Sequence, residues 1–222
     1  MLSRFLTILS VGVVATLISA SAGSGPLSAQ ELGSFPTKAH PLLADAKNKR
    51  VLIYVEVNPK NHGNSNPHWC VVFQGGKLKD KAILQAFCSP QEFHDALLQI
   101  GARPGNNLTL RSSGEVIEGD ELAVTVTQPG LAKNLGLADI VDDSSGKGIR
   151  IRFGGNRQRA SEENTGCITC LESCPIGITS NAAYPAIGSF KRLVSPNSQF
   201  KLKNDKIPLQ GGLILIYSLK SN

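Results

Sequence analysis

The chain has 222 residues, and 41% of them are apolar, so it can bury a sizeable hydrophobic core. Charged residues make up 18% and aromatic residues 5% of the chain, which also holds 22 glycines and 12 prolines. This composition argues against global disorder and against coiled coils, and it favours turn-rich β structure. The formal net charge of +6 is modest and no nucleic-acid-binding motif accompanies it, so nucleic acid is not an expected partner.

Residues 1–22 have the features of a secretory signal peptide. A short basic region ends at Arg4, an apolar run extends from Phe5 to Ile18, and small residues follow at Ala20 and Ala22. The apolar run is shorter than the roughly 20 residues that span a bilayer. We therefore expect an exported protein, periplasmic or extracellular, with no integral membrane span in the mature chain.

Two further segments follow the predicted signal peptide. Residues 23–48 are rich in Gly, Ser, Pro and Ala without a sustained apolar period, which is typical of a flexible tether. Residues 49–222 show no internal repeat and are expected to form a single β-rich domain, with a cysteine loop at 164–181.

Short alternating or apolar runs, separated by Gly, Pro and Asn, predict β-strands through this domain. The runs lie at 51–57, 69–73, 82–88, 108–111, 121–127, 149–153, 200–203 and 213–219. From these short runs broken by turn residues, we expect an α+β fold that is predominantly antiparallel β and sandwich-like.

One main helix is predicted near residues 90–100. Ser89 can cap its start, Pro90 suits the first helical position, and Glu92 completes a capping box with Ser89. Gly101 supplies a left-handed stop. His94, in the middle of this helix, is expected to lie on the surface.

Four arginines stand close together between Lys147 and Arg159. Arg150 and Arg152, and then Arg157 and Arg159, have strand spacing and would share faces of a sheet. The simpler interpretation is a solvated sheet face, and the alternative is a patch that steers an anionic partner.

Three of the five cysteines fall in the run GCITCLESCP at 166–175. Its spacing, C-x2-C-x3-C-P, matches the last three positions of the bacterial ferredoxin run C-x2-C-x2-C-x3-C-P, although Asn164 stands at the first position. A four-thiolate site would therefore take its fourth ligand from Cys70 or Cys88. The motif predicts a possible [4Fe-4S] cluster on Cys167, Cys170 and Cys174.

Two alternatives remain open for these cysteines. An exported chain meets an oxidising compartment, so disulfide bonds are one alternative. A zinc ion held by thiolates with a nitrogen from His68 is another. No nucleophile elbow, HExxH motif, phosphate-binding loop or dinucleotide fingerprint is present, so no catalytic residue is predicted and an enzyme is not indicated.

Several segments resemble the YdjY-type domain family. The runs AFCSPQEFHDALL at 86–98 and IGARPGN at 100–106 resemble the family in general. The runs IRFGGN at 151–156, NTGCITCLESCP at 164–175 and GITSN at 177–181 resemble its cysteine-bearing branch, described as ferredoxin-like. The similarity extends over residues 49–219.

The resemblance implies an exported β-rich domain that binds an iron–sulfur cluster through Cys167, Cys170 and Cys174. Cys88, inside another matching segment, is the preferred fourth ligand or bridge partner, and Cys70 is the alternative. We therefore expect an exported ferredoxin-like redox or metal-binding protein, an electron-transfer or accessory module with a redox partner protein. The alternative function is a disulfide-stabilised, non-enzymatic binding domain without metal.

Overall fold

The computed structural model describes residues 35–61, 63–128, 131, 133–187 and 200–220. The predicted signal peptide and the first part of the predicted tether lie outside these residues. The later part of the tether contains strand β1 (Leu42–Asp45), which pairs antiparallel with the strand that follows it.

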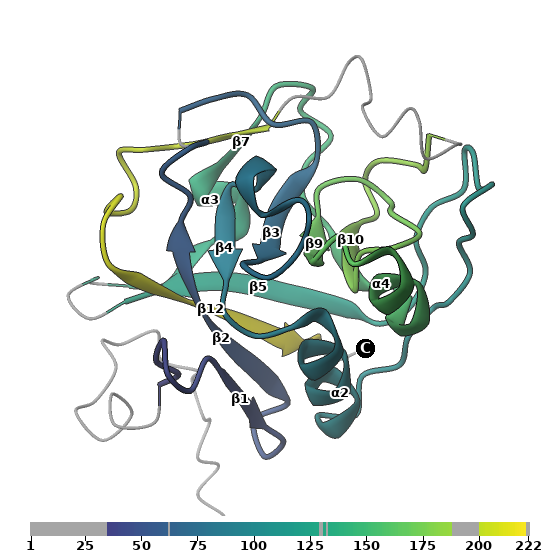
Figure 1. The fold of residues 1–222 in the computed structure, drawn as a ribbon, viewed down its shortest axis with the longest axis horizontal. Coiled ribbons are helices and arrows are strands. Elements are labelled where there is room, and N and C mark those ends of the chain that lie inside the picture. The colour runs from purple at the N-terminus through teal and green to yellow at the C-terminus, as the bar shows by residue number, and fades with distance from the viewer. Residues whose placement is uncertain (1–34, 62, 129–130, 132, 188–199, 221–222) are drawn as a thin grey trace, which may run out of the picture.

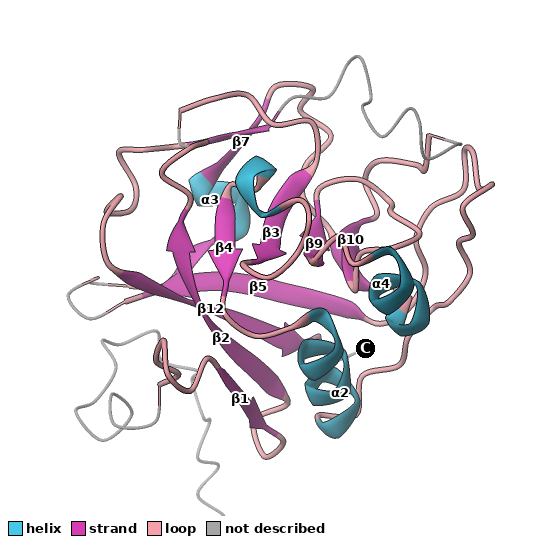
Figure 2. Cartoon of the chain, in the orientation of Figure 1, coloured by secondary structure: helices cyan, strands magenta, loops and turns pink. Residues whose placement is uncertain are grey.

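A closed ring of eight strands dominates the described structure (Figures 1 and 2). The strands, in their order around the ring, are β2 (Arg50–Val57), β12 (Gly212–Leu219), β5 (Glu121–Thr127), β8 (Ile151–Phe153), β10 (Thr179–Asn181), β9 (Cys167–Cys170), β3 (Trp69–Phe73) and β4 (Leu84–Ala86). Strand β4 pairs with both β3 and β2, and this double pairing closes the barrel.

The remaining elements are short. Strand β6 (Leu135–Gly136) pairs with β5, and strands β7 (Val141–Asp143) and β11 (Phe200–Leu202) form a separate two-stranded sheet. The helices are α2 (Pro90–Gln99), α3 (Leu137–Ile140), α4 (Arg157–Glu163) and the 3₁₀ turn η1 (Lys79–Lys81). Helices α2 and α4 lie next to each other at one end of the barrel (Figure 1).

The predicted α+β, sandwich-like antiparallel fold is wrong. The structure is a closed mixed barrel, in which β9 and β10, and also β3 and β4, run parallel. Hydrophobic alternation shows which face of a strand is buried, but it does not show which strands are neighbours. The second partner of β4 therefore left no signal in the sequence pattern.

Most of the predicted strands are present, whereas one of them is not. The run 108–111 forms a turn, and the run 82–88 contains only the three-residue strand β4. The arginine pattern also misled in part, because Arg157 and Arg159 belong to helix α4. Asn156, in the left-handed region with φ 57°, begins that helix directly after β8.

The main predicted helix is confirmed as α2, with its capping box. Ser89 Oγ accepts a hydrogen bond from the Glu92 backbone N–H at 3.2 Å, and Glu92 Oε2 accepts one from the Ser89 N–H at 2.7 Å. The surface position expected for His94 is wrong. Its ring is 7% exposed and packs against Phe153 at a centroid distance of 5.1 Å.

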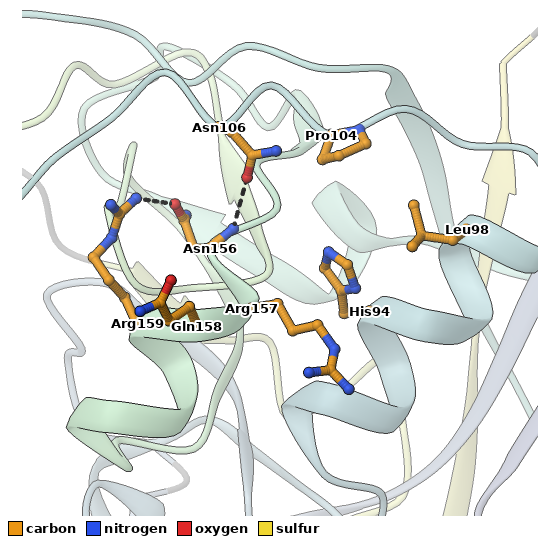
Figure 3. A pocket seen from close by; sticks show the side chains of 8 residues that line it. All are labelled: His94, Leu98, Pro104, Asn106, Asn156, Arg157, Gln158 and Arg159. Atoms are coloured by element: carbon orange, nitrogen blue, oxygen red, sulfur yellow. Dashed lines mark hydrogen bonds between the residues drawn. The ribbon is translucent and has the colours of Figure 1, made fainter.

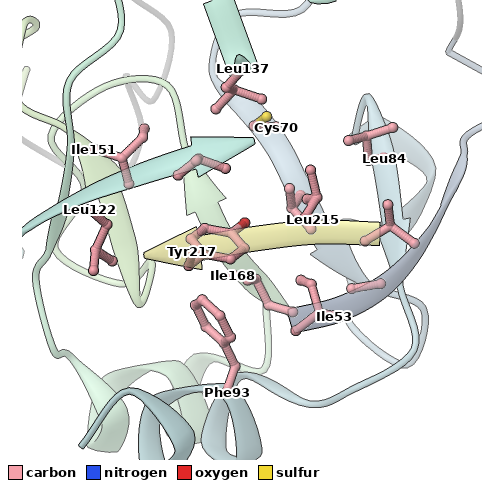
Figure 4. Close-up of a cluster of buried hydrophobic side chains, with 14 of the residues drawn as sticks. Ile53, Cys70, Leu84, Phe93, Leu122, Leu137, Ile151, Ile168, Leu215 and Tyr217 are labelled. Carbon is pink, nitrogen blue, oxygen red and sulfur yellow. The ribbon is translucent and has the colours of Figure 1, made fainter. Parts of the chain in front are cut away.

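The main core fills the barrel and the space beneath α2 (Figure 4). Inside it, the Thr169 hydroxyl is hydrogen-bonded to the Tyr217 hydroxyl at 2.7 Å and to the Thr179 hydroxyl at 2.9 Å. All three residues are fully buried. These bonds join β9, β10 and β12 across the interior, and they satisfy hydroxyls that water does not reach.

We predict that Thr169→Val lowers the free energy of unfolding by about 1–3 kcal/mol, because it removes the hydrogen-bond partner of the buried Tyr217 hydroxyl. The Thr179 hydroxyl keeps its hydrogen bond to the Ile168 carbonyl. Urea denaturation under reducing conditions measures the change. Thr169→Ser, which keeps the hydroxyl, is the matched control and is expected to retain most of the stability. A Thr169→Val variant as stable as the parent protein would contradict this account of the interior.

Candidate functional site

The site begins with an irregularity shared by two neighbouring strands. Strands β3 and β9 are antiparallel, with Trp69 opposite Cys170 and Val72 opposite Cys167, and the register shifts twice between these pairs. In a regular strand, residues three apart point to opposite faces. Here the register shifts alter the direction in which the side chains of β9 point, as a β-bulge does.

As a result, Cys167 and Cys170 share a face. They belong to a small buried cluster with Cys174 and with four residues from β3 and the adjoining segments, namely Trp69, Val72, Ala82 and Ile176. The intervening Ile168 faces the main core instead. The structure thus brings together the three cysteines of the sequence motif, which we call the cysteine trio.

Cys174 lies in the segment after β9, where backbone N–H groups converge on its sulfur. Cys174 Sγ accepts hydrogen bonds from the N–H of Gly177 at 3.3 Å and from that of Ile176 at 3.5 Å. Gly177 is needed for close packing, since a Cβ at this position would lie 2.7 Å from Cys170 Sγ. Cys174 is 6% exposed, the largest value among the five cysteines.

This environment separates the acidities of two neighbouring thiols. The pKa of Cys174 is lowered to about 7, chiefly by a hydrogen bond with Cys170 and further by the N–H groups of Gly177 and Ile176. The pKa of Cys170 is raised well above its ordinary value by its hydrogen bonds with Cys167 and Cys174 and by burial. Cys174 is therefore the more acidic thiol of the pair.

Side chains from outside the motif hold the segment that carries these N–H groups. Asn156 Nδ2 donates to the carbonyl of Cys174 at 3.1 Å and to that of Gly177 at 2.9 Å. Arg159 Nε donates to the Pro175 carbonyl at 2.6 Å. The sequence analysis assigned neither residue this supporting role, although Arg159 belongs to the arginine pattern and Asn156 ends one of the runs that resemble the family.

Cys70 and Cys88 lie elsewhere. Both are fully buried members of the main core, a different cluster from that of the cysteine trio, and Figure 4 shows Cys70 among the core side chains. Burial raises the pKa of each of these thiols to about 12. Neither thiol belongs to the buried cluster of the trio, and a fourth ligand from Cys88 or Cys70 stays a prediction.

The side chains that could bind a metal ion bear on the cluster and zinc sites predicted from the sequence. Within the described ranges, no group of three or more His, Cys, Asp or Glu side chains is placed to hold a metal ion. His68 is buried, and its ring packs at a tilt of 44° against that of Trp69, with the centroids 4.3 Å apart. Binding of an iron–sulfur cluster, or of a zinc ion with a nitrogen from His68, therefore stays a prediction.

A pocket lies beside the cysteine segment, between α2, α4 and the chain near Pro104. It has a volume of about 330 Å³, and its polar lining includes Asn156 and Arg159 (Figure 3). The same two side chains thus form part of the pocket wall and hold residues 174–177 in place. Among the described residues, no helix is long and apolar enough to cross a membrane.

Fold and site together define a closed mixed β-barrel domain with a buried cysteine trio in its wall. The YdjY domain family matches residues 42–218, and the chain belongs to this family. An uncharacterized protein YdjY of Escherichia coli (strain K12) is 36% identical over 149 residues, which cover 67% of this chain and 66% of the relative. The aligned region thus falls just short of two thirds of that relative's length. No solved structure matches the chain.

We predict that native-state alkylation of Cys174 increases as the pH rises through a midpoint near 7, because its thiolate is stabilised by the hydrogen bonds described above. Iodoacetamide labelling at a series of pH values, followed by mass spectrometry, measures the profile. Cys70 and Cys88 are expected to react only after denaturation.

The Cys174→Ser variant should lose the neutral-pH labelling, whereas Cys88→Ser should keep it. A native profile that rises only near pH 9, the ordinary pKa of a cysteine thiol, would contradict the assignment of Cys174 as the thiolate.

Proposed function

We propose that this protein is a thiol redox module in which Cys174 is the reacting thiolate and Cys170 is its partner thiol. The observation that carries the proposal is the geometry at Cys174 Sγ, which accepts hydrogen bonds from two backbone N–H groups. Cys174 also lies in the same buried cluster as Cys170, whose thiol lowers the pKa of Cys174. Both features favour a thiolate, and the thiolate is the form of cysteine that attacks disulfides. The motif predicted electron transfer by an iron–sulfur cluster, whereas this proposal assigns the redox chemistry to the sulfur atoms of the chain itself.

The proposed reaction is thiol–disulfide exchange with an external disulfide. Cys174 Sγ attacks one sulfur of that disulfide, its S–S bond breaks, and the other sulfur leaves as a thiolate. Cys170 then loses its proton and attacks Cys174 Sγ, which releases the second thiolate and forms a Cys170–Cys174 disulfide. Two electrons pass from the protein to the external disulfide, and the reverse sequence oxidises a partner dithiol.

The predicted leader fits this chemistry. Export would place the domain in a compartment where disulfides form and persist, and the partner would be another exported protein or a small disulfide. The segment that carries the leader lies outside the described residues, so export is part of the proposal.

A disulfide-stabilised binding domain is the second candidate. The burial of the cysteine trio supports it, because Cys167, Cys170 and Cys174 are 3%, 0% and 6% exposed. A bridge at this depth would brace the barrel wall without exchanging with partners. The two candidates differ in one property, the reversibility of the bridge in the native state.

The test is the reaction of the reduced protein with oxidised glutathione. The parent protein is expected to release two glutathione thiols per chain and to form an internal bridge, which dithiothreitol then reduces without unfolding. Cys174→Ser should release none, and Cys170→Ser should stop at the mixed disulfide. Cys88→Ser, a buried cysteine outside the trio, is the matched control and should behave as the parent.

A bridge that forms but resists native-state reduction would favour the binding domain and reject the redox module. Iron and sulfide analysis of anaerobically purified protein addresses the cluster separately. Stoichiometric iron and sulfide that depend on the cysteine trio would overturn the thiol-exchange proposal in favour of a cluster.

A further inference from the structure

The pocket between α2 and α4 has the size and chemistry of a small-molecule site. Its volume of about 330 Å³ is at the lower end of the range for ligand pockets, roughly 300–1,000 Å³. It is open on one side, where Leu98 and Pro104 form an apolar rim (Figure 3). The rest of its lining is polar and comes from His94, Asn106, Asn156, Arg157, Gln158 and Arg159.

The two arginines of this lining differ in how their charges are balanced. Arg157 forms a two-point ion pair with Asp95, with both N–O distances at 2.8 Å, and Asp95 also contacts His94 Nδ1 at 3.1 Å. The hydrogen bonds from Arg157 hold the pKa of the Asp95 carboxyl at about 2. The charge of Arg157 is therefore already neutralised by the protein.

Arg159 has no such partner. In the described part of the chain, no carboxylate lies within ion-pair distance of it. Its Nε and Nη2 atoms donate instead to neutral oxygens, namely the carbonyls of Pro175 and Leu108 and the side-chain oxygen of Asn156. The guanidinium group is half-buried, fixed in orientation by these bonds, and uncompensated in charge.

Neutral acceptors orient a guanidinium group without cancelling its charge. A charge fixed in this way at a pocket wall attracts an anion at little further cost in side-chain entropy. Carboxylate and phosphate oxygens suit a guanidinium group best, since they accept its charge-assisted hydrogen bonds. The Asn106, Gln158 and His94 side chains add polar groups around the same space (Figure 3).

We propose that this pocket binds a small molecule that carries an oxyanion, a carboxylate or a phosphate, with Arg159 as its charge partner. The Asn156 and Arg159 side chains also hold the carbonyls of Cys174, Pro175 and Gly177. The ligand would therefore bind against the supports of the cysteine segment. Binding itself does not depend on the proposed redox function.

The test is a titration of the reduced protein with inorganic phosphate and, separately, with succinate, at constant ionic strength. The chain has 4 histidines, so the imidazole proton signals are few, and the His94→Gln variant assigns the signal of His94. We expect the His94 signal to shift saturably with phosphate or succinate and not with sodium chloride. The anion that saturates at lower concentration identifies the ligand class.

Two variants locate the site. Arg159→Gln should weaken binding at least about tenfold, because it removes a charge-assisted hydrogen bond. Leu98→Trp fills the mouth of the pocket from a side chain that is 46% exposed and should weaken binding as strongly. Leu110→Trp, at a position 38% exposed and outside the pocket lining, is the matched control and should bind as the parent.

If Arg159→Gln does not fold, as judged by circular dichroism, the two tryptophan variants decide the question. Equal binding by Leu98→Trp and Leu110→Trp would overturn the proposal. So would a parent protein in which neither phosphate nor succinate gives a saturable shift.

Discussion

The site depends on the paired register shift in β3 and β9. Without it, the three-residue spacing of Cys167 and Cys170 would place the two sulfurs on opposite faces of the barrel wall. The shift turns both toward Trp69 and Val72, and it leaves Ile168 and Cys70 to face the main core. One local departure from regular pairing thus gathers the cysteine trio and sets Cys70 apart from it.

The barrel supplies a rigid base for this departure. Thr169, between the cysteines of β9, is tied through buried hydroxyls to β10 and to Tyr217 of β12. On the side of Cys174, Asn156 and Arg159 hold the backbone from the start of α4. The barrel wall on one side and Asn156 and Arg159 on the other therefore fix the N–H groups that donate to the sulfur of Cys174. Donors held in fixed positions stabilise a thiolate without having to reorganise.

The sequence was informative where local chemistry decides structure. The capping box at Ser89 and Glu92 predicted α2, and the apolar runs at 51–57 and 213–219 predicted two strands that pair in the barrel. The short spacing of Cys167, Cys170 and Cys174 correctly indicated that their side chains gather. In each case the interacting residues are close in sequence, so the pattern carries the signal.

It was uninformative where distant segments meet. The closing pairs of β4, the register shifts of β3 and β9, and the separation of Cys88 from the trio all depend on tertiary contacts between remote residues. His94 was misplaced because its burial comes from Phe153, far along the chain. The pocket was missed for the same reason, since its two walls α2 and α4 are far apart in the sequence and become neighbours only when the chain folds.

Disulfide mapping of the protein after mild oxidation tests the central claim most directly. A glutamyl protease cuts after Glu163 and Glu172, and trypsin cuts after Arg159 and Lys191. Together they put Cys174 on a different peptide from Cys167 and Cys170. The account predicts that these two peptides remain linked until they are reduced, and that the Cys170→Ser variant diminishes the link. A bridge to Cys70 or Cys88, or a link undiminished in the Cys170→Ser variant, would contradict it.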